Sequence, residues 1–227
     1  MRERIKKLLD EIDYLSSKSL FKEKVKLVAV SKTFGAEKIL EAYDCGIRIF
    51  GENKVQEAIC KIDILKEYKD IKWHLIGHLQ SNKVKKCKVF SLIHSIDSIK
   101  LLEEFSKFED SEKPDLLIQI NSSKEETKSG LFIEDVYNFF DKIIELGLNK
   151  KLNIRGLMTI GPLTDDESKI RLAFRNTRKL YEDLQYKYNI KFDILSMGMS
   201  SDYKIAIEEG SNMVRIGSLI FGERNYV

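Results

Sequence analysis

The sequence predicts an α/β fold: a single (β/α)8 TIM-type barrel with an extra helix at its N-terminus. Eight short, apolar, β-branched runs alternate with amphipathic helical patterns, the order of a parallel sheet with right-handed crossovers. Eight such units fit within about 200 residues, as a closed barrel requires. An open doubly wound sheet is the alternative, but no G-x-G-x-x-G motif follows the first strand.

The first predicted element is a helix, because one apolar stripe runs through Ile5, Leu8, Leu9, Ile12 and Leu15. The first strand covers 26–32 and is apolar on both faces, as expected for a strand between two layers. The further strands are predicted at 47–50, 72–77, 90–94, 115–120, 154–160, 192–196 and 213–216. Between them lie helices over 36–45, 55–68, 99–108 and 133–146, a long helix with a stripe from Ile170 to Leu184, and a helix over 202–209. Glycines that commonly end helices follow three of them, at Gly46, Gly147 and Gly210.

The composition fits one domain over residues 1–227. The 43% of hydrophobic residues can form a sizeable core, and the 33% of charged residues can cover it. With 39 basic and 36 acidic residues, the net charge of +3 gives no overall field that would attract nucleic acid. The three cysteines are not closely spaced, which disfavours a disulfide framework and favours a reducing cytoplasm. No apolar run approaches the ~20 residues that span a bilayer, and the N-terminus lacks the apolar core of a signal peptide. We therefore expect a cytoplasmic protein.

A functional site is expected at the C-terminal ends of the strands, where such barrels place their chemistry. Polar residues end most of the predicted strands, and Lys32 closes the first one. An apolar surrounding would favour the neutral amine, which can attack an aldehyde to form a Schiff base. The alternative is a lysine that simply extends to water from the end of its strand.

The last two strands carry a second signal. Gly198, Ser200 and Ser201 follow the seventh strand, and Gly217 and Ser218 follow the eighth. Glycines let backbone N–H groups approach an anion, serine hydroxyls add donors, and these two loops commonly hold a phosphate in barrels of this type. The sequence therefore indicates a phosphate cradle close to Lys32.

Over essentially its whole length, the chain resembles the YggS/PROSC family of pyridoxal phosphate homeostasis proteins, which is similar to the barrel domain of alanine racemase. The matching stretches are 28–33, 50–57, 73–83, 94–97, 128–130, 155–158, 195–200 and 214–222. This resemblance implies a fold type III barrel that binds pyridoxal 5′-phosphate (PLP). It implies that Lys32 forms the Schiff base, that Ser200, Gly217 and Ser218 hold the phosphate, that Arg215 faces the pyridine nitrogen, and that Asn53 and Met158 line the ring.

The implied function is PLP homeostasis, by buffering the cofactor or delivering it to PLP-dependent apoenzymes, without substantial catalysis. A guanidinium only donates hydrogen bonds, so Arg215 would keep the ring nitrogen unprotonated and the ring a weak electron sink. No second domain is expected to supply the tyrosine that alanine racemase uses, and Tyr226 is too short a tail to replace it. We expect a monomer with no catalytic residue assigned. A low-activity PLP-dependent racemase and a barrel for another phosphate ligand are the alternatives.

Two other features have simpler interpretations. His74 and His78 are four residues apart, but no third ligand clusters with them and no H-E-x-x-H motif occurs, so no metal site is expected. The basic run Lys83, Lys85, Lys86 and Lys88 could contact a phosphate, although a solvated helix face is the ordinary interpretation.

Overall fold

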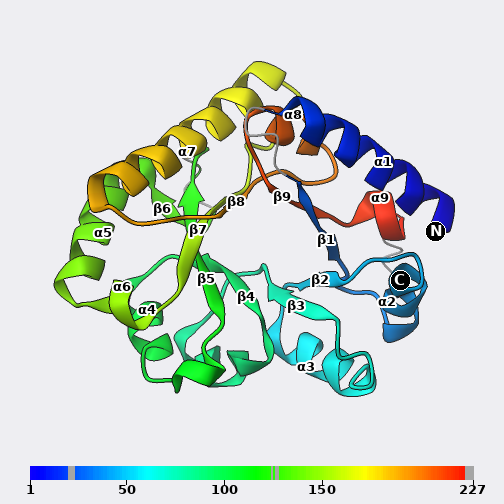
Figure 1. Cartoon of the computed structure of the whole chain (residues 1–227), viewed down its shortest axis with the longest axis horizontal. Helices are drawn as coiled ribbons and strands as arrows, with labels where there is room; N and C mark the ends of the chain where they lie inside the picture. The colour runs from blue at the N-terminus through cyan, green and yellow to red at the C-terminus, as the bar shows by residue number, and fades with distance from the viewer. Residues whose placement is uncertain (20–23, 124, 126–127, 223–227) are drawn as a thin grey trace.

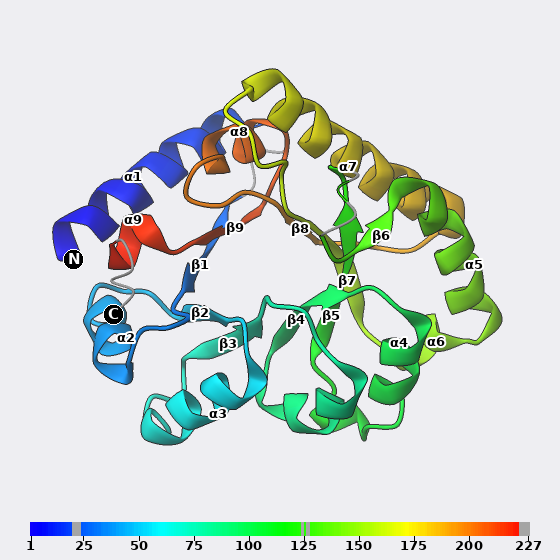
Figure 2. The same cartoon turned by 180° about the vertical axis from the view of Figure 1, so that it is seen from behind.

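Eight parallel strands close into a barrel surrounded by helices (Figures 1 and 2). The computed structural model describes residues 1–19, 24–123, 125 and 128–222. Each strand pairs in parallel with the next, and β9 pairs with β1 to complete the ring, so the predicted closed barrel is confirmed and the open sheet was wrong. The barrel strands are β1 (Lys26–Val30), β2 (Ile49–Glu52), β3 (Lys72–Leu75), β4 (Leu92–Ile96), β5 (Asp115–Asn121), β7 (Ile154–Thr159), β8 (Ile194–Ser196) and β9 (Met213–Ile216).

The predicted helices occur before the first strand and between the later ones. They are α1 (Arg2–Lys18), α2 (Ala36–Tyr43), α3 (Val55–Ile64), α4 (Ile99–Phe105), α5 (Val136–Glu145), α7 (Glu167–Tyr188) and α8 (Tyr203–Glu208). The predicted helix over 133–146 begins as the 3₁₀ helix η3 (Ile133–Asp135) and continues as α5. Further short elements were not predicted: the 3₁₀ helices η1 (Ser81–Val89) and η2 (Asp110–Glu112), the strand β6 (Leu131–Phe132), and the helices α6 (Leu148–Lys151) and α9 (Ser218–Phe221). They are two to nine residues long, too short for a periodic pattern to indicate.

Several strands begin later than predicted because a preceding turn uses their first residues. Phe90 caps η1 by donating its N–H to the Cys87 carbonyl, so β4 starts at Leu92. The Phe192 N–H is bound by the Gln185 side chain of α7, so β8 starts at Ile194. The first strand also ends early, at Val30, which places Ser31 and Lys32 in the loop that follows.

The extra N-terminal helix covers the last units of the barrel. Its buried stripe of Ile5, Leu8 and Ile12 agrees with the predicted one. α1 packs against α8 and α9, next to β9 and β1 (Figure 1). Burial of each such aliphatic side chain contributes about 1.5–3 kcal/mol, so α1 ties the first residues of the chain to the last barrel units.

Inside the barrel, an apolar layer is followed by a polar one. Side chains alternate along a strand, so residues i and i+2 face the same way. Leu92, Ile194 and Met213 belong to a buried apolar cluster together with Val28, Leu117 and Met158. Two residues further along the same strands lie His94, Ser196 and Arg215, all buried. The polar layer therefore lies nearer the C-terminal ends of the strands, where a site is expected.

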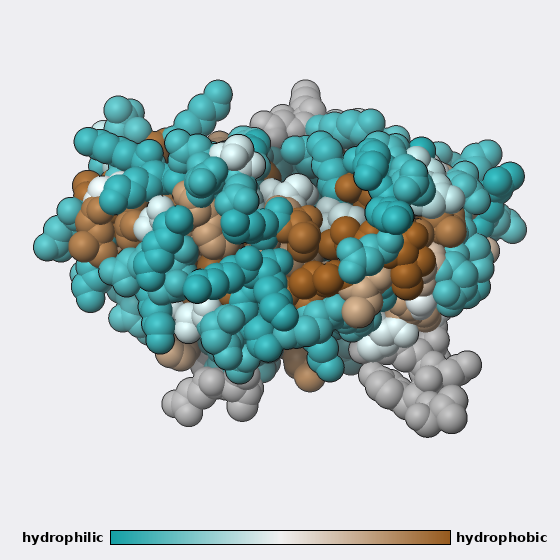
Figure 3. All heavy atoms as spheres, turned by 90° about the horizontal axis from the view of Figure 1, so that it is seen from below, coloured by the Kyte–Doolittle hydropathy of each residue, from teal (hydrophilic) through white to brown (hydrophobic). Residues whose placement is uncertain are grey.

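The outer surface is predominantly charged and polar. Figure 3 shows one side of the molecule as mostly hydrophilic, with apolar side chains gathered among the charged ones. Within the described ranges, no helix combines the length and the apolar character needed to cross a bilayer.

Candidate functional site

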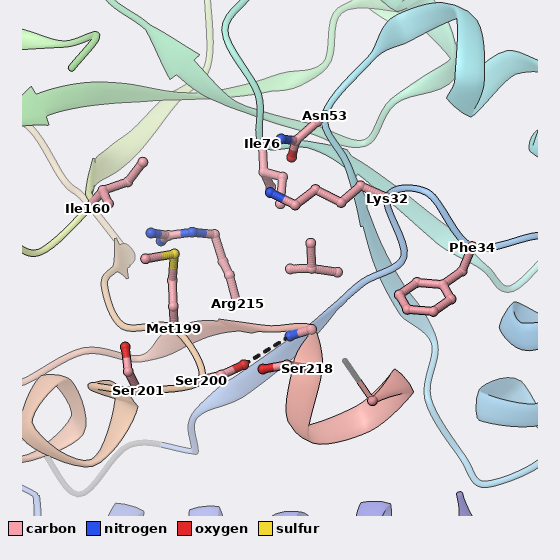
Figure 4. A pocket seen from close by; sticks show the side chains of 13 residues that line it. Lys32, Phe34, Asn53, Ile76, Ile160, Met199, Ser200, Ser201, Arg215 and Ser218 are labelled. Atoms are coloured by element: carbon pink, nitrogen blue, oxygen red, sulfur yellow. Dashed lines mark hydrogen bonds between the residues drawn. The ribbon is translucent and has the colours of Figure 1, made fainter. Parts of the chain in front are cut away.

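A cavity of about 610 Å³ opens at the C-terminal ends of the barrel strands. Its lining comes from the segments that follow β1, β2, β3, β7, β8 and β9 (Figure 4). The lining residues are Val30, Lys32, Phe34, Asn53, Ile76, Ile160, Met199, Ser200, Ser201, Arg215, Gly217, Ser218 and Gly222. The cavity thus lies where the sequence placed the site.

Of the seven predicted site residues, six line this cavity: Lys32, Asn53, Ser200, Arg215, Gly217 and Ser218. Met158 does not, because it is fully buried in the apolar layer below. Ile160 follows it on the same face of the chain and forms the wall instead. Ile76 and Met199 also line the cavity although no polar signal in the sequence marked them.

Lys32 extends into the cavity from a turn that a buried ionic cluster holds on both sides. The Lys61 ammonium donates to the Ser31 carbonyl at 2.9 Å, and the Thr33 N–H donates to Oε1 of Glu57 at 2.7 Å. Ser31 and Thr33 are the two neighbours of Lys32 in the chain. Thr33 has a φ of 71°, in the left-handed region that a β-branched residue rarely adopts. The cluster therefore holds an otherwise unfavourable backbone conformation at Thr33, directly after Lys32.

The same ammonium joins two carboxylates. Lys61 Nζ lies 2.8 Å from Oε1 of Glu52 and 2.7 Å from Oε1 of Glu57, and the Ser31 hydroxyl donates to the same Glu52 oxygen. Burial raises the pKa of Glu52, and its Oε2 is buried without a hydrogen-bond partner among the described residues. Burial alone would also raise the pKa of Glu57, but the hydrogen bonds from Lys61 and Thr33 outweigh it and lower that pKa.

Hydroxyl and amide donors gather at another part of the cavity. The Gly217 N–H donates to the Ser200 hydroxyl at 3.3 Å, and Ser218 lies beside them (Figure 4). A sharp turn brings Ser200 there: Gly198 has a φ of 93°, and a Cβ on it would lie 2.6 Å from the Cβ of Ala206. Glycine is thus required in the turn that carries Ser200 to the end of β9. Uncharged donors grouped in this way suit an anionic oxygen group.

Arg215 brings a buried positive charge to the cavity. Its side chain donates to the Ser196 hydroxyl at 2.7 Å and to the Thr159 carbonyl at 2.8 Å. Burial lowers the pKa of Arg215 to about 10, while the attraction of Asp202 acts in the opposite direction. The guanidinium is therefore still protonated at neutral pH. Together with Lys32 it makes the cavity suited to an anionic ligand.

The histidines do not form the pair that the spacing allowed. His74 is buried and contacts His94, with 3.0 Å between Nδ1 and Nε2. His78 lies on the surface 3.6 Å from Asp97, because the chain leaves the strand after Leu75. Within the part of the chain that the structure describes, no group of three or more His, Cys, Asp or Glu residues could hold a metal ion.

The remaining expectations concern the basic run and the chain end. Lys85, Lys86 and Lys88 are exposed on η1, and Lys88 pairs with Glu112. This is the solvated helix face that the charge pattern ordinarily indicates. Tyr226 lies outside the described residues.

Sequence comparison relates the whole chain to known proteins. Residues 6–225 match the family described as alanine racemase, N-terminal domain. A pyridoxal phosphate homeostasis protein of Aquifex aeolicus is 42% identical over 99% of this chain and 98% of its own length. One of Helicobacter pylori is 40% identical over 98% of each chain.

Solved structures agree with this relationship. PipY of Synechococcus elongatus is 36% identical, with 97% of this chain and 99% of that one covered; its structures without and with PLP bound give TM-scores of 0.86 and 0.84. Alanine racemase of Corynebacterium glutamicum has a TM-score of 0.66 at 16% identity, covering 96% of this chain and 62% of that one, which shows a shared fold. The chain belongs to the family of pyridoxal phosphate homeostasis proteins, built on the barrel of the alanine racemase N-terminal domain.

Proposed function

We propose that this protein binds PLP reversibly on Lys32 and serves PLP homeostasis, by buffering the cofactor or delivering it to PLP-dependent apoenzymes. One observation carries the proposal: a lysine amine, a group of hydroxyl and amide donors and a buried guanidinium converge on one cavity. Each of these groups matches a different part of the cofactor. The relatives named as homeostasis proteins and the PLP-bound PipY structure support the same assignment.

The residues present fit this cofactor. PLP supplies an aldehyde that an amine can trap and a phosphate that hydrogen-bond donors can hold. Lys32 is the amine at the cavity wall, and Ser200, Gly217 and Ser218 would donate to the phosphate oxygens, with the Gly217 N–H turning to them from the Ser200 hydroxyl. Asn53, which follows β2, and the apolar Ile76 and Ile160 line the same cavity and would border the flat ring of the cofactor.

Arg215 supports a carrier rather than an efficient enzyme. A protonated guanidinium can only donate, so it accepts no proton from the ring and gives none up at neutral pH. An unprotonated ring nitrogen makes the cofactor a weaker electron sink. The charged side chains in the described lining are Lys32 and Arg215, both basic. We therefore propose that amino acids are turned over slowly or not at all, in contrast to a racemase.

Two further parts of the proposal concern the oligomeric state and the cellular compartment. The six residues that we assign to the cofactor meet in one cavity of a single chain, and we propose that a monomer suffices for binding. Cys45, Cys60 and Cys87 are all free thiols, which supports a reducing cytoplasm as the working compartment.

Borohydride reduction tests the assignment of Lys32. The purified protein is incubated with PLP, reduced, digested and mapped by mass spectrometry. The cofactor is expected on the peptide that contains Lys32, and Lys32→Ala should lose this label. Lys54→Ala is the matched control, because Lys54 is an exposed lysine beside Asn53 outside the lining, and it should keep the label. A label that survives in Lys32→Ala at the wild-type level would contradict the proposal.

A further inference from the structure

A chain of four buried side chains runs from the cavity into the barrel. Arg215 donates to the Ser196 hydroxyl at 2.7 Å, Ser196 Oγ lies 3.2 Å from Nδ1 of His94, and Nε2 of His94 lies 3.0 Å from Nδ1 of His74. All four side chains are at most 4% exposed. They come from β9, β8, β4 and β3, which carry them to the barrel interior from separate parts of the sequence.

In this hydrogen-bonded series of side chains, each member donates to the next, from Arg215 to His74. Arg215 can only donate, so the oxygen of Ser196 accepts. The single hydroxyl proton of Ser196 is then directed to Nδ1 of His94, which leaves the His94 proton on Nε2 to be donated to His74. With the His94 proton on Nδ1 instead, Ser196 would accept two hydrogen bonds, one from Arg215 and one from His94. The hydroxyl proton of Ser196 would then have no acceptor among the contacts of the described residues. The satisfied arrangement therefore has neutral histidines, each with its proton on Nε2.

Both imidazoles are held neutral by their surroundings. Burial lowers the pKa of His74 to about 3 and that of His94 well below its usual value. The guanidinium is consequently backed by neutral dipoles, namely the Ser196 hydroxyl and the Thr159 carbonyl. Among the described residues no carboxylate is hydrogen-bonded to it, although Asp202 attracts it electrostatically, so the guanidinium keeps its positive charge beside the cavity.

Packing alone does not require these polar groups. One layer below, the same three strands β4, β8 and β9 place Leu92, Ile194 and Met213 in the barrel interior. Burying a polar side chain costs free energy unless its hydrogen bonds are satisfied, so an apolar layer would be the simpler filling. The change from apolar to polar occurs at the level of Arg215, which suggests that the polar layer serves Arg215.

We propose that Ser196 and His94 are positioning residues that fix the orientation of the Arg215 guanidinium toward the ring nitrogen of the bound cofactor. This inference rests on the proposed function for its ligand, but the hydrogen-bonded chain itself is a property of the protein alone. It predicts that the electronic state of the bound cofactor depends on residues that do not contact it.

The first experiment examines the four hydrogen-bonded side chains in the protein without cofactor. Long-range ¹H–¹⁵N NMR of the imidazoles is favourable because the sequence has three histidines. His94 and His74 should each be neutral with the proton on Nε2, and Ser196→Ala should shift the His94 Nδ1 resonance. Ser95→Ala is the matched control, a fully buried serine on β4 that donates to the Gly77 carbonyl instead. A His94 proton on Nδ1, or an unchanged Nδ1 resonance in Ser196→Ala, would overturn the proposal.

The second experiment uses PLP affinity and the absorption spectrum of the bound cofactor. Ser196→Ala and His94→Leu should weaken binding about tenfold, the order expected for one lost hydrogen bond to a charged group, and shift the absorption maximum. His94→Gln keeps one acceptor and one donor and should restore both properties. In an Arg215→Met background, Ser196→Ala should have no further effect, because it acts through Arg215. Equal effects of Ser196→Ala in the two backgrounds would refute the positioning role. If the wild type fails to bind PLP, the proposed function is wrong. The NMR result would still show whether the hydrogen bonds from Arg215 to His74 have the stated direction.

Discussion

The ammonium of Lys61 donates a hydrogen bond to the backbone carbonyl of Ser31 at 2.9 Å, and thereby reaches from α3 to the residue just before Lys32. The amide just after Lys32, that of Thr33, is bound by Glu57 on the same helix. The backbone on both sides of the lysine that we assign to the cofactor is thus held by α3, a helix packed outside the barrel. Glu52, at the end of β2, completes the cluster from inside.

Removing the centre of this cluster should damage both stability and binding. Lys61→Met deletes three hydrogen bonds and leaves the fully buried Glu52 without its cation. Breaking one partner of a buried ion pair costs about 3–5 kcal/mol, which urea unfolding can measure. PLP affinity should fall with it, since the Lys32 turn loses its support.

Lys38→Met provides the comparison. Lys38 forms an ion pair with Glu41 in which the two side chains are 41% and 47% exposed. Loss of such a surface pair should change the unfolding free energy by less than about 1 kcal/mol and leave PLP affinity unchanged. Similar losses in both variants would contradict a special role of the Lys61 cluster.

The hydroxyls of Ser200 and Ser218 should increase affinity for phosphorylated ligands only. Ser200→Ala and Ser218→Ala each remove one hydrogen bond to a charged group, about 1.5–3 kcal/mol, which corresponds to a roughly ten- to hundredfold loss of PLP affinity. Unphosphorylated pyridoxal should bind weakly to the wild type and equally weakly to both variants. Titration followed by absorbance measures all of these affinities, and equal affinity of the wild type for PLP and pyridoxal would exclude the cradle.

The turn at Gly198 offers a test of local geometry. Gly198→Ala combines a positive φ with a Cβ that would clash with Ala206, whereas Gly46 has a φ of 94° and nothing within 4 Å of its Cβ position. Gly46→Ala should therefore lower the free energy of unfolding only by the cost of a left-handed backbone conformation, about 1–2 kcal/mol, and leave PLP affinity unchanged. Gly198→Ala should cost more and also displace Ser200, which lowers PLP affinity. Equal behaviour of the two variants in unfolding and binding measurements would contradict the assigned role of this turn.

The buried histidines predict a dependence of stability on pH. The pKa values of His74 and His94 are lowered in the folded state, so below about pH 6.5 the unfolded chain takes up protons that the folded chain does not. Their contribution to stability is complete above that pH and is lost as the pH falls, by about 1.4 kcal/mol per pH unit for each histidine. His94→Gln should reduce this slope relative to the wild type between pH 6 and 4.5, measured by urea unfolding. An unchanged slope would show that His94 is not held neutral.

Much of the fold and of the site follows from local patterns. Apolar runs and helical stripes predicted the eight barrel strands, and the polar residues after them indicated Lys32, Asn53, Ser200, Arg215, Gly217 and Ser218. These six residues line one cavity because the C-terminal ends of parallel strands meet at one end of a barrel, while their roles toward the cofactor stay predictions. The family resemblance implied that Met158 lines the ring, but Met158 lies in the apolar layer and Ile160 lines the cavity instead. The periodicity of a strand could not have corrected this assignment, because it shows which side chains face inward but not their height along the barrel.

Other parts of the site depend on contacts that sequence patterns do not reveal. Lys61 is one charged residue among many on a helix, and its burial results from the way α3 packs over the Lys32 turn. His94 and Ser196 are 102 residues apart and meet because β4 and β8 carry them to the same level inside the barrel. The spacing of His74 and His78 indicated a possible pair, but the strand ends between them.

The most direct test of the carrier role compares two reactions of the PLP-bound protein. In one, the protein is mixed in deuterated water with L- and D-amino acids, and deuterium at their α-carbon is measured. In the other, it is mixed with the apo-form of a PLP-dependent enzyme, and the activity of that enzyme is measured. We predict that the activity of that enzyme is restored and that deuterium enters the α-carbon only near the background rate. Arg215 would leave the ring a poor acceptor of charge, and a missing general acid or base costs about 10²–10⁴ in rate. Rapid, stereospecific α-deuteration without transfer of the cofactor would rule out the carrier role and favour a racemase.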